Sequence, residues 1–244
     1  MNDDIIEKVQ QYVQEHIGEF HKKRIEKLSQ LKLKKLLKQK NPYLYKAKDL
    51  NTPEKVVRSL ADAFMSSAEE TLFGDWLEGL AIFVAHEVYG GSKSSSEGID
   101  LEMDKEGIHY VVSIKSGPNW SNSSSMAKLK QCFRKAQRIH ATSGNKQLCI
   151  PIEGCCYGNK KSSAEADHTK LCGQAFWSFI SGSSSLYTDI VEPLGTDAHV
   201  KNEEYQKEYG KMITKFSREF ANEYCDENGA IKWPEIVELN SKAK

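Results

Sequence analysis

The chain lacks several features that would set it apart from ordinary globular proteins. No apolar run approaches the roughly 20 residues of a membrane span, and the N-terminal stretch M-N-D-D-I-I-E-K has no basic-then-apolar signal. The chain contains no C-x-x-C motif, internal repeat or low-complexity linker. Hydrophobic residues make up 39% of the 244 positions and charged residues 28%, which is typical of a folded protein. We therefore expect no membrane partner and a cytoplasmic location.

The chain also has a formal net charge of zero, because 34 basic residues balance 34 acidic ones. This balance argues against a protein that coats nucleic acid. The basic residues are nevertheless clustered, with eleven lysines and arginines between Lys22 and Lys48 and a second group between Lys128 and Arg138. Local basic patches on a neutral protein suit reversible binding of a polyanion. The alternative is that these are ordinary solvated helix faces.

Hydrophobic periodicity predicts mostly helices around a short β region. A helix is expected from residue 3 to residue 40, where Asn41-Pro42 would stop it. Thr52 and Pro53 have the N-cap and first-turn preferences of a second helix start. Further helices are expected at 75–89, 125–140, 170–181 and 204–224, with a core strand at 147–152. This order predicts a mixed α/β core at 71–244 behind an N-terminal helical segment at 1–70.

The segment S-E-G-I-D-L-E-M-D-K-E-G-I-H-Y-V-V-S-I-K, which starts at Ser96, predicts a β-hairpin. Apolar and polar residues alternate on both sides of Glu106-Gly107, and period two indicates two strands with one buried face each. Glycine readily takes a positive φ angle, so Glu106-Gly107 fits a two-residue loop that pairs Lys105 with Ile108.

In that register Asp100 faces Ser113, with Lys115 one diagonal away on the same non-core face. Opposed side chains lie roughly 5 Å apart and diagonal ones roughly 7–8 Å apart. An acid and a lysine held in this way can bind a divalent metal and activate water against a phosphodiester. The alternative interpretation is an ordinary amphipathic hairpin with a charged outer face.

The residues around the hairpin bear on this choice. The polar loop from Ser116 to Ser125 breaks the strand, and its small residues suit close approach of a phosphate backbone. In the helix before the hairpin, Asp75-x-x-Glu78 resembles a capping box. Alternatively, Glu78 points into the same cleft as Asp100 and supplies a second carboxylate. A zinc site is also conceivable, but its spacing fits no established zinc pattern; its ligands would be Cys155, Cys156, His168 and Cys172.

A helix with a glutamate, followed by E-G-I-D-L and Y-V-V-S-I-K, resembles the PD-(D/E)xK nuclease superfamily. The continuation K-S-G-P-N-W-S-N-S-S-S resembles type II restriction endonucleases of the PmeII-like sort. Asp100 matches the metal-binding aspartate of the superfamily, and Lys115 matches its catalytic lysine. The sequence departs from the pattern twice, because Ile99 replaces the nominal proline and Ser113 replaces the usual second acid.

The resemblance implies a restriction-endonuclease-like α/β fold, with a mixed central sheet flanked by helices. It implies Mg²⁺-dependent hydrolysis of double-stranded DNA by a homodimer. Asp100, Glu78 and the Ile114 carbonyl would hold the metal near Ser113, with Glu102 as the reserve acid. Contacts to DNA are expected from six residues and from the 1–70 segment, which could also form the dimer. The six are Ser116, Asn119, Asn122, Lys128, Lys130 and Arg134.

Two other functions stay open at this point. One is a repair or junction-resolving nuclease on the same fold. The other is a catalytically inactive DNA-binding module, which the serine at position 113 suggests. Cleavage that requires Mg²⁺ would exclude the inactive module, and the choice of DNA substrate would separate the two nucleases.

Overall fold

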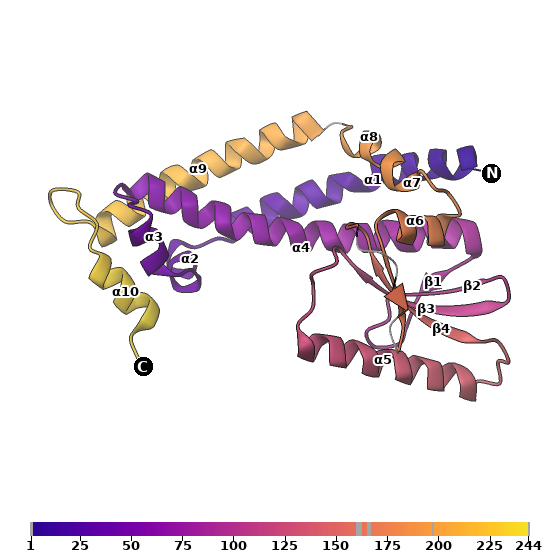
Figure 1. The fold of residues 1–244 in the computed structure, drawn as a ribbon. Helices are drawn as coiled ribbons and strands as arrows, with labels where there is room; N and C mark the ends of the chain where they lie inside the picture. The colour runs from indigo at the N-terminus through magenta and orange to yellow at the C-terminus, as the bar shows by residue number, and fades with distance from the viewer. Residues whose placement is uncertain (1, 160–162, 165–166, 197, 244) are drawn as a thin grey trace. The chain divides into compact units, whose positions relative to one another are not determined.

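The computed structural model describes residues 2–159, 163–164, 167–196 and 198–243. Figure 1 shows the order of the elements in these residues. They are α1 (Asn2–Ser29), α2 (Leu33–Gln39), α3 (Pro42–Ala47), α4 (Pro53–Tyr89), β1 (Ser92–Lys93), β2 (Leu101–Lys105), β3 (Ile108–Lys115), α5 (Ser123–Thr142), β4 (Cys149–Cys155), β5 (Ser163–Ala164), β6 (Thr169–Cys172), α6 (Gln174–Ser181), α7 (Leu186–Asp189), α8 (Val191–Leu194), α9 (Ala198–Tyr224) and α10 (Trp233–Ser241).

The chain forms two compact units. Unit 1 consists of Met1–Ile17 and Phe73–Thr196, and unit 2 consists of Gly18–Leu72 and Asp197–Lys244. The division differs from the expected boundary after residue 70, because the C-terminal helices group with residues 18–72 and not with the sheet. None of the helices in the described residues has the length and apolar composition of a membrane span.

Unit 1 is built on a mixed sheet with the strand order β1-β2-β3-β4-β6-β5. The β2–β3 pair is antiparallel, whereas β3–β4 and β4–β6 are parallel. Helix α5 covers one face, and α6 with the C-terminal part of α4 covers the other (Figure 1). The predicted fold class, a mixed sheet flanked by helices, is confirmed.

The β2–β3 hairpin has the predicted register, in which Lys105 pairs with Ile108 and Leu101 pairs with Val112. Its loop residues Glu106 and Gly107 have φ angles of 52° and 77°. Two consecutive positive φ angles are the mark of the tight turn whose twist matches that of paired strands.

The predicted alternation of a buried and a solvent-facing side is confirmed in β2, where Leu101 and Met103 are buried and Asp104 is exposed, but it is wrong for the second half of β3. All residues from Val111 to Ile114 are buried, because β3 lies between β2 and β4 and helices cover both faces. Val111 packs in the cluster around Phe133 of α5, and the Tyr110 ring lies 4.9 Å from that of Phe179 in α6. A strand buried on both faces loses the simple alternation of apolar and polar residues.

The expected helix at 3–40 breaks after Ser29. Lys32 is extended, with φ −133° and ψ 133°. A continuous helix would scatter the leucines around its circumference, whereas the break lets Leu33, Leu36 and Leu37 all be buried in unit 2. The helix start at Thr52 is confirmed, since its hydroxyl accepts from the Lys55 N–H at 3.4 Å.

Two further expectations about helices are wrong. α4 runs unbroken from Pro53 to Tyr89, so no helix begins near Asp75; a single glycine, Gly74, does not suffice to end a helix. The expected helix at 170–181 begins only at Gln174, because residues 169–172 pair with β4 as strand β6. In contrast, α5 covers the expected 125–140 and extends to Ser123–Thr142.

Unit 2 is a helical cluster with its own core. Aromatic residues of α9, including Phe216 and Phe220, pack with leucines of α2 and with Leu60 of α4. Ile236 of α10 is 1% exposed in the same cluster. These contacts explain why the C-terminal helices belong with residues 18–72.

Candidate active site

Asp100 lies directly before β2, where its backbone is already paired. Its N–H donates to the Val112 carbonyl at 2.9 Å. One carboxylate oxygen, Oδ2, accepts from the Ile114 N–H at 2.6 Å and from the Ser113 hydroxyl at 3.3 Å. The predicted proximity of Asp100 and Ser113 is confirmed, and two donors fix the orientation of the carboxylate.

Lys115 is the last residue of β3 and lies beside this carboxylate. Its Nζ is 3.6 Å from Asp100 Oδ2 and donates to the Ile114 carbonyl at 2.9 Å. The Lys115 and Asp100 side chains are 24% and 21% exposed. An acid and a lysine therefore lie together, partly shielded from water but within reach of a ligand.

Glu78 comes from the middle of α4, and this position shows that the capping-box interpretation is wrong. Its carboxylate lies 3.5 Å from Nζ of Lys93 on β1. Burial, and next the charge of Asp100, raise the pKa of Glu78 above its ordinary value, while Lys93 and Lys115 lower it. Glu78 thus shares one electrostatic environment with Asp100 and Lys115.

The three oxygen donors at this place fit a hard divalent cation. Glu78 and Asp100 offer carboxylates and Ile114 a carbonyl, the ligand type that Mg²⁺ prefers. Burial is the larger cause of the raised pKa of Glu78 and the charge of Asp100 the second, and a bound cation would offset both. Among the described residues, no group of three or more His, Cys, Asp or Glu side chains could hold a metal. Mg²⁺ commonly keeps several waters, so two protein carboxylates are compatible with it.

Glu102 and Ser113 are the other two residues expected at the site, and each has its own hydrogen-bond partners. Glu102 accepts a short hydrogen bond from the Ser94 hydroxyl and lies 3.5 Å from Nε2 of His109, so its carboxylate already has two partners. Ser113 is fully buried, and its hydroxyl supports the Asp100 carboxylate. The charge of Asp100 thus acts on Glu78, and the Glu102 carboxylate contacts Ser94 and His109.

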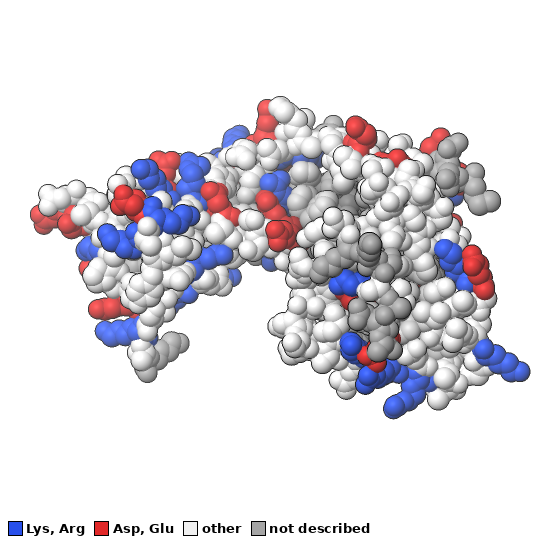
Figure 2. Space-filling model, viewed as in Figure 1, with Lys and Arg blue, Asp and Glu red and all other residues white. Residues whose placement is uncertain are grey.

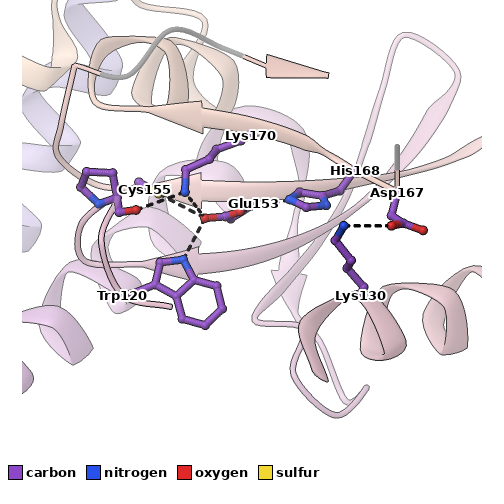
Figure 3. A network of polar contacts seen from close by, with 8 residues as sticks. Trp120, Lys130, Glu153, Cys155, Asp167, His168 and Lys170 are labelled. Carbon is purple, nitrogen blue, oxygen red and sulfur yellow. Dashed lines mark hydrogen bonds and ion pairs between the residues drawn. The ribbon is translucent and has the colours of Figure 1, made fainter. Parts of the chain in front are cut away.

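A further acid, Glu153, lies on the neighbouring strand β4, and it was not identified from the sequence. Glu153 of β4 pairs in register with Ser113 and is fully buried. It accepts hydrogen bonds from Trp120 Nε1 at 2.8 Å, Lys170 Nζ at 2.5 Å and His168 Nε2 at 3.0 Å (Figure 3). The available signal was an acid inside the apolar run C-I-P-I-E-G-C-C, because a buried charge needs partners.

These partners keep Glu153 ionised. Burial alone would raise the pKa of the carboxyl, but hydrogen bonds from His168, Lys170 and Trp120 outweigh burial and lower the pKa to about 2. Both of its oxygens are occupied by donors, so Glu153 is a fixed charge within the fold and not a free ligand.

The residues expected to contact DNA are exposed or partly exposed, and several of them already have partners. Asn119 is exposed. Asn122 caps α5, where its side chain accepts from the Ser125 N–H. Ion pairs join Lys128 to Glu97, and Lys130 and Arg134 to Asp167. On the face shown in Figure 2, basic side chains gather along α5.

Ser116 directly follows Lys115, in a loop held by close backbone packing. The Ser116 carbonyl accepts from the Tyr157 N–H at 3.0 Å. A Cβ atom at Gly117 would come within 2.3 Å of the Tyr157 ring. The aromatic ring therefore lies directly on the loop that follows the lysine.

The conceivable zinc ligands Cys155, Cys156, His168 and Cys172 do not form a group that could hold a metal among the described residues, and the buried thiols are neutral. All six cysteines are free. Burial raises the pKa of Cys156 to about 12 and that of Cys155 further. His168, the fourth member of the conceivable zinc set, directs Nε2 at Glu153.

The mixed sheet, its flanking helices and the aspartate–lysine pair at adjacent strands together define a restriction-endonuclease-like α/β protein. A family comparison agrees with this class. The chain belongs to the family of the type II restriction endonuclease EcoO109I, whose model matches residues 7–202. A search of curated proteins found no match.

Proposed function

We propose that this protein is a type II restriction endonuclease that cleaves double-stranded DNA at a specific sequence with Mg²⁺. The observation that carries the proposal is the contact of Asp100 with Lys115, next to a second carboxylate whose pKa is raised, in a chain of this family. The narrower likeness to PmeII-like enzymes belongs to the same proposal.

In the proposed mechanism Asp100, Glu78 and the Ile114 carbonyl would hold Mg²⁺. When bound, the ion would polarise the scissile phosphate and lower the pKa of a water. Lys115 would orient the attacking water and stabilise the negative charge that develops on the phosphate. The Ser113 hydroxyl and the Ile114 N–H hold the Asp100 carboxylate in place for this role.

Cutting both strands of a duplex requires two such sites, and a symmetric homodimer is the economical way to supply them. We propose that the 1–70 segment contributes dimer or DNA contacts. Ser116, Asn119, Asn122 and the basic face of α5 would approach the DNA. Arg134, Lys128 and Lys130 would exchange their ion pairs with Asp167 and Glu97 for phosphates.

Sedimentation of the protein with and without a DNA duplex should give the mass of a dimer.

The direct test is incubation of the purified protein with linear phage DNA and Mg²⁺, followed by mapping of the fragment ends. We expect discrete fragments with a common end sequence, and no fragments when a chelator is present. Nicking only at branched or damaged DNA would instead indicate a repair or junction-resolving enzyme. Binding without any cleavage would indicate an inactive DNA-binding module and would refute the proposal.

A further inference from the structure

Trp120 links the lysine of the candidate site to the buried acid network. Its ring faces Lys115, with Nζ 5.2 Å from the ring centroid. Its indole N–H donates to Glu153 Oε1 at 2.8 Å. One side chain therefore contacts the lysine through its π face and a fixed buried charge through its edge. An ammonium group is attracted to the face of an indole ring, so the ring favours one position of Nζ.

Glu153 is held more firmly than a surface acid would be. Lys170 Nζ approaches it to 2.5 Å and His168 Nε2 to 3.0 Å, and its side chain is 0% exposed. Figure 3 shows Glu153 between Lys170, His168 and Trp120. Removing one partner of a buried ion pair is destabilising, but replacing the whole pair by apolar residues often costs no stability. Such a pair is better explained by the geometry that it fixes.

The same network also holds the loop between Lys115 and Trp120. Lys170 Nζ donates a second hydrogen bond to the Pro118 carbonyl at 3.3 Å. A Cβ atom at Gly158 would come within 2.7 Å of the Pro118 ring. The loop is thus fixed at Pro118 and again at Trp120.

We propose that Trp120 is a positioning residue for Lys115, and that the buried Glu153–Lys170 pair holds Trp120 in place. This inference rests on the proposed function, since the position of Lys115 matters only if the lysine acts on a phosphate. The role is indirect, because Trp120 acts through Lys115. A displacement of Lys115 by a fraction of an ångström would weaken transition-state stabilisation without removing a DNA contact.

The test compares Trp120→Ala and Trp120→Phe with the wild type. Phenylalanine keeps a ring beneath Lys115 but loses the N–H donor to Glu153. The matched control is Trp233→Phe in unit 2, where Lys46 Nζ lies 5.9 Å from the indole centroid. The single-turnover cleavage rate is measured on a duplex that carries the mapped site. Affinity for the same duplex is measured in chelator, and thermal unfolding reports the folded fraction.

We expect Trp120→Ala to lose about 30-fold in cleavage rate, with metal-free DNA affinity within about twofold of wild type. Trp120→Phe should lose less, and Trp233→Phe should cleave at the wild-type rate. A purely structural role would lower rate and affinity together through the folded fraction. Wild-type cleavage by Trp120→Ala, or an equal loss of affinity in chelator, would overturn the inference. Absence of cleavage by the wild type itself would instead contradict the proposed function.

Discussion

Removal of the buried charge at Glu153 should produce a loss of stability that depends on pH. In the Glu153→Gln variant the side chain keeps its size, but Lys170 and His168 lose their anionic partner. The pKa of Glu153 is about 2 in the folded protein, against an ordinary value of 4.5. The difference of about 2.5, at 1.36 kcal/mol per pKa unit, corresponds to about 3 kcal/mol. Because Glu153 is fully buried, solvent screening reduces this value little.

The direction of this pH dependence follows from the lowered pKa of Glu153. Above the unfolded-state value of 4.5 the carboxylate stabilises the folded protein fully, and this stabilisation is lost as the pH falls through 2. The free energy of unfolding of wild type should therefore exceed that of Glu153→Gln by about 3 kcal/mol at neutral pH. The difference between the two proteins should shrink between pH 4.5 and pH 2.

Urea unfolding followed by tryptophan fluorescence measures this difference, because Trp76, Trp120 and Trp177 all belong to unit 1. Glu97→Gln is the matched control. Its carboxylate is 63% exposed and pairs with Lys128 at 3.6 Å, and its removal should change stability by less than about 1 kcal/mol. A difference between wild type and Glu153→Gln that stays constant from pH 7 to pH 2 would refute the reasoning.

Four other outcomes are expected. Lys115→Ala should lower the cleavage rate by about 10³-fold while metal-free DNA binding persists; rapid cleavage would remove the lysine from the mechanism. Ser113→Ala removes one weak support of the Asp100 carboxylate, so the rate should fall only about 5-fold. Gly117→Ala should push the Tyr157 ring off the loop and slow cleavage, and the added change Tyr157→Ala should restore the rate; failure of this rescue would show that the clash is unimportant. Phe176→Ala should lower the free energy of unfolding by about 3–5 kcal/mol in urea titrations, since its ring is fully buried.

The parts of the fold that sequence could predict are those set by neighbouring residues. The β2–β3 register follows from a two-residue loop that needs positive φ angles, and the Thr52 cap follows from local hydrogen bonding. Both depend on interactions within a few positions, so the relevant residues are visible together in the chain.

The errors arose where distant segments decide the structure. Ser113 is buried because β4, about 40 positions later in the chain, pairs beside β3. The break in the helix at Lys32 allows the leucines of α2 to be buried against α9. Residues 169–172 have no helical or strand preference strong enough to settle their state before β4 is placed next to them.

The candidate site was predictable in part for the same reason. Asp100 and Lys115 lie on one hairpin, and the missing acid at Ser113 pointed to Glu78. The network around Glu153 brings together β4, β6 and the loop at Trp120, and only the three-dimensional structure joins them. A charge in an apolar strand signalled that partners exist but not which residues they are.

The most direct test of the three-part site compares Glu78→Gln with Glu102→Gln on a duplex carrying the mapped sequence in Mg²⁺. Both changes remove one charge and keep the side-chain size. If Glu78, Asp100 and Lys115 form the site, Glu78→Gln should cleave about 10²–10³-fold more slowly than wild type. Glu102→Gln should cleave within about threefold of it. Loss of cleavage in Glu102→Gln with full activity in Glu78→Gln would contradict the site.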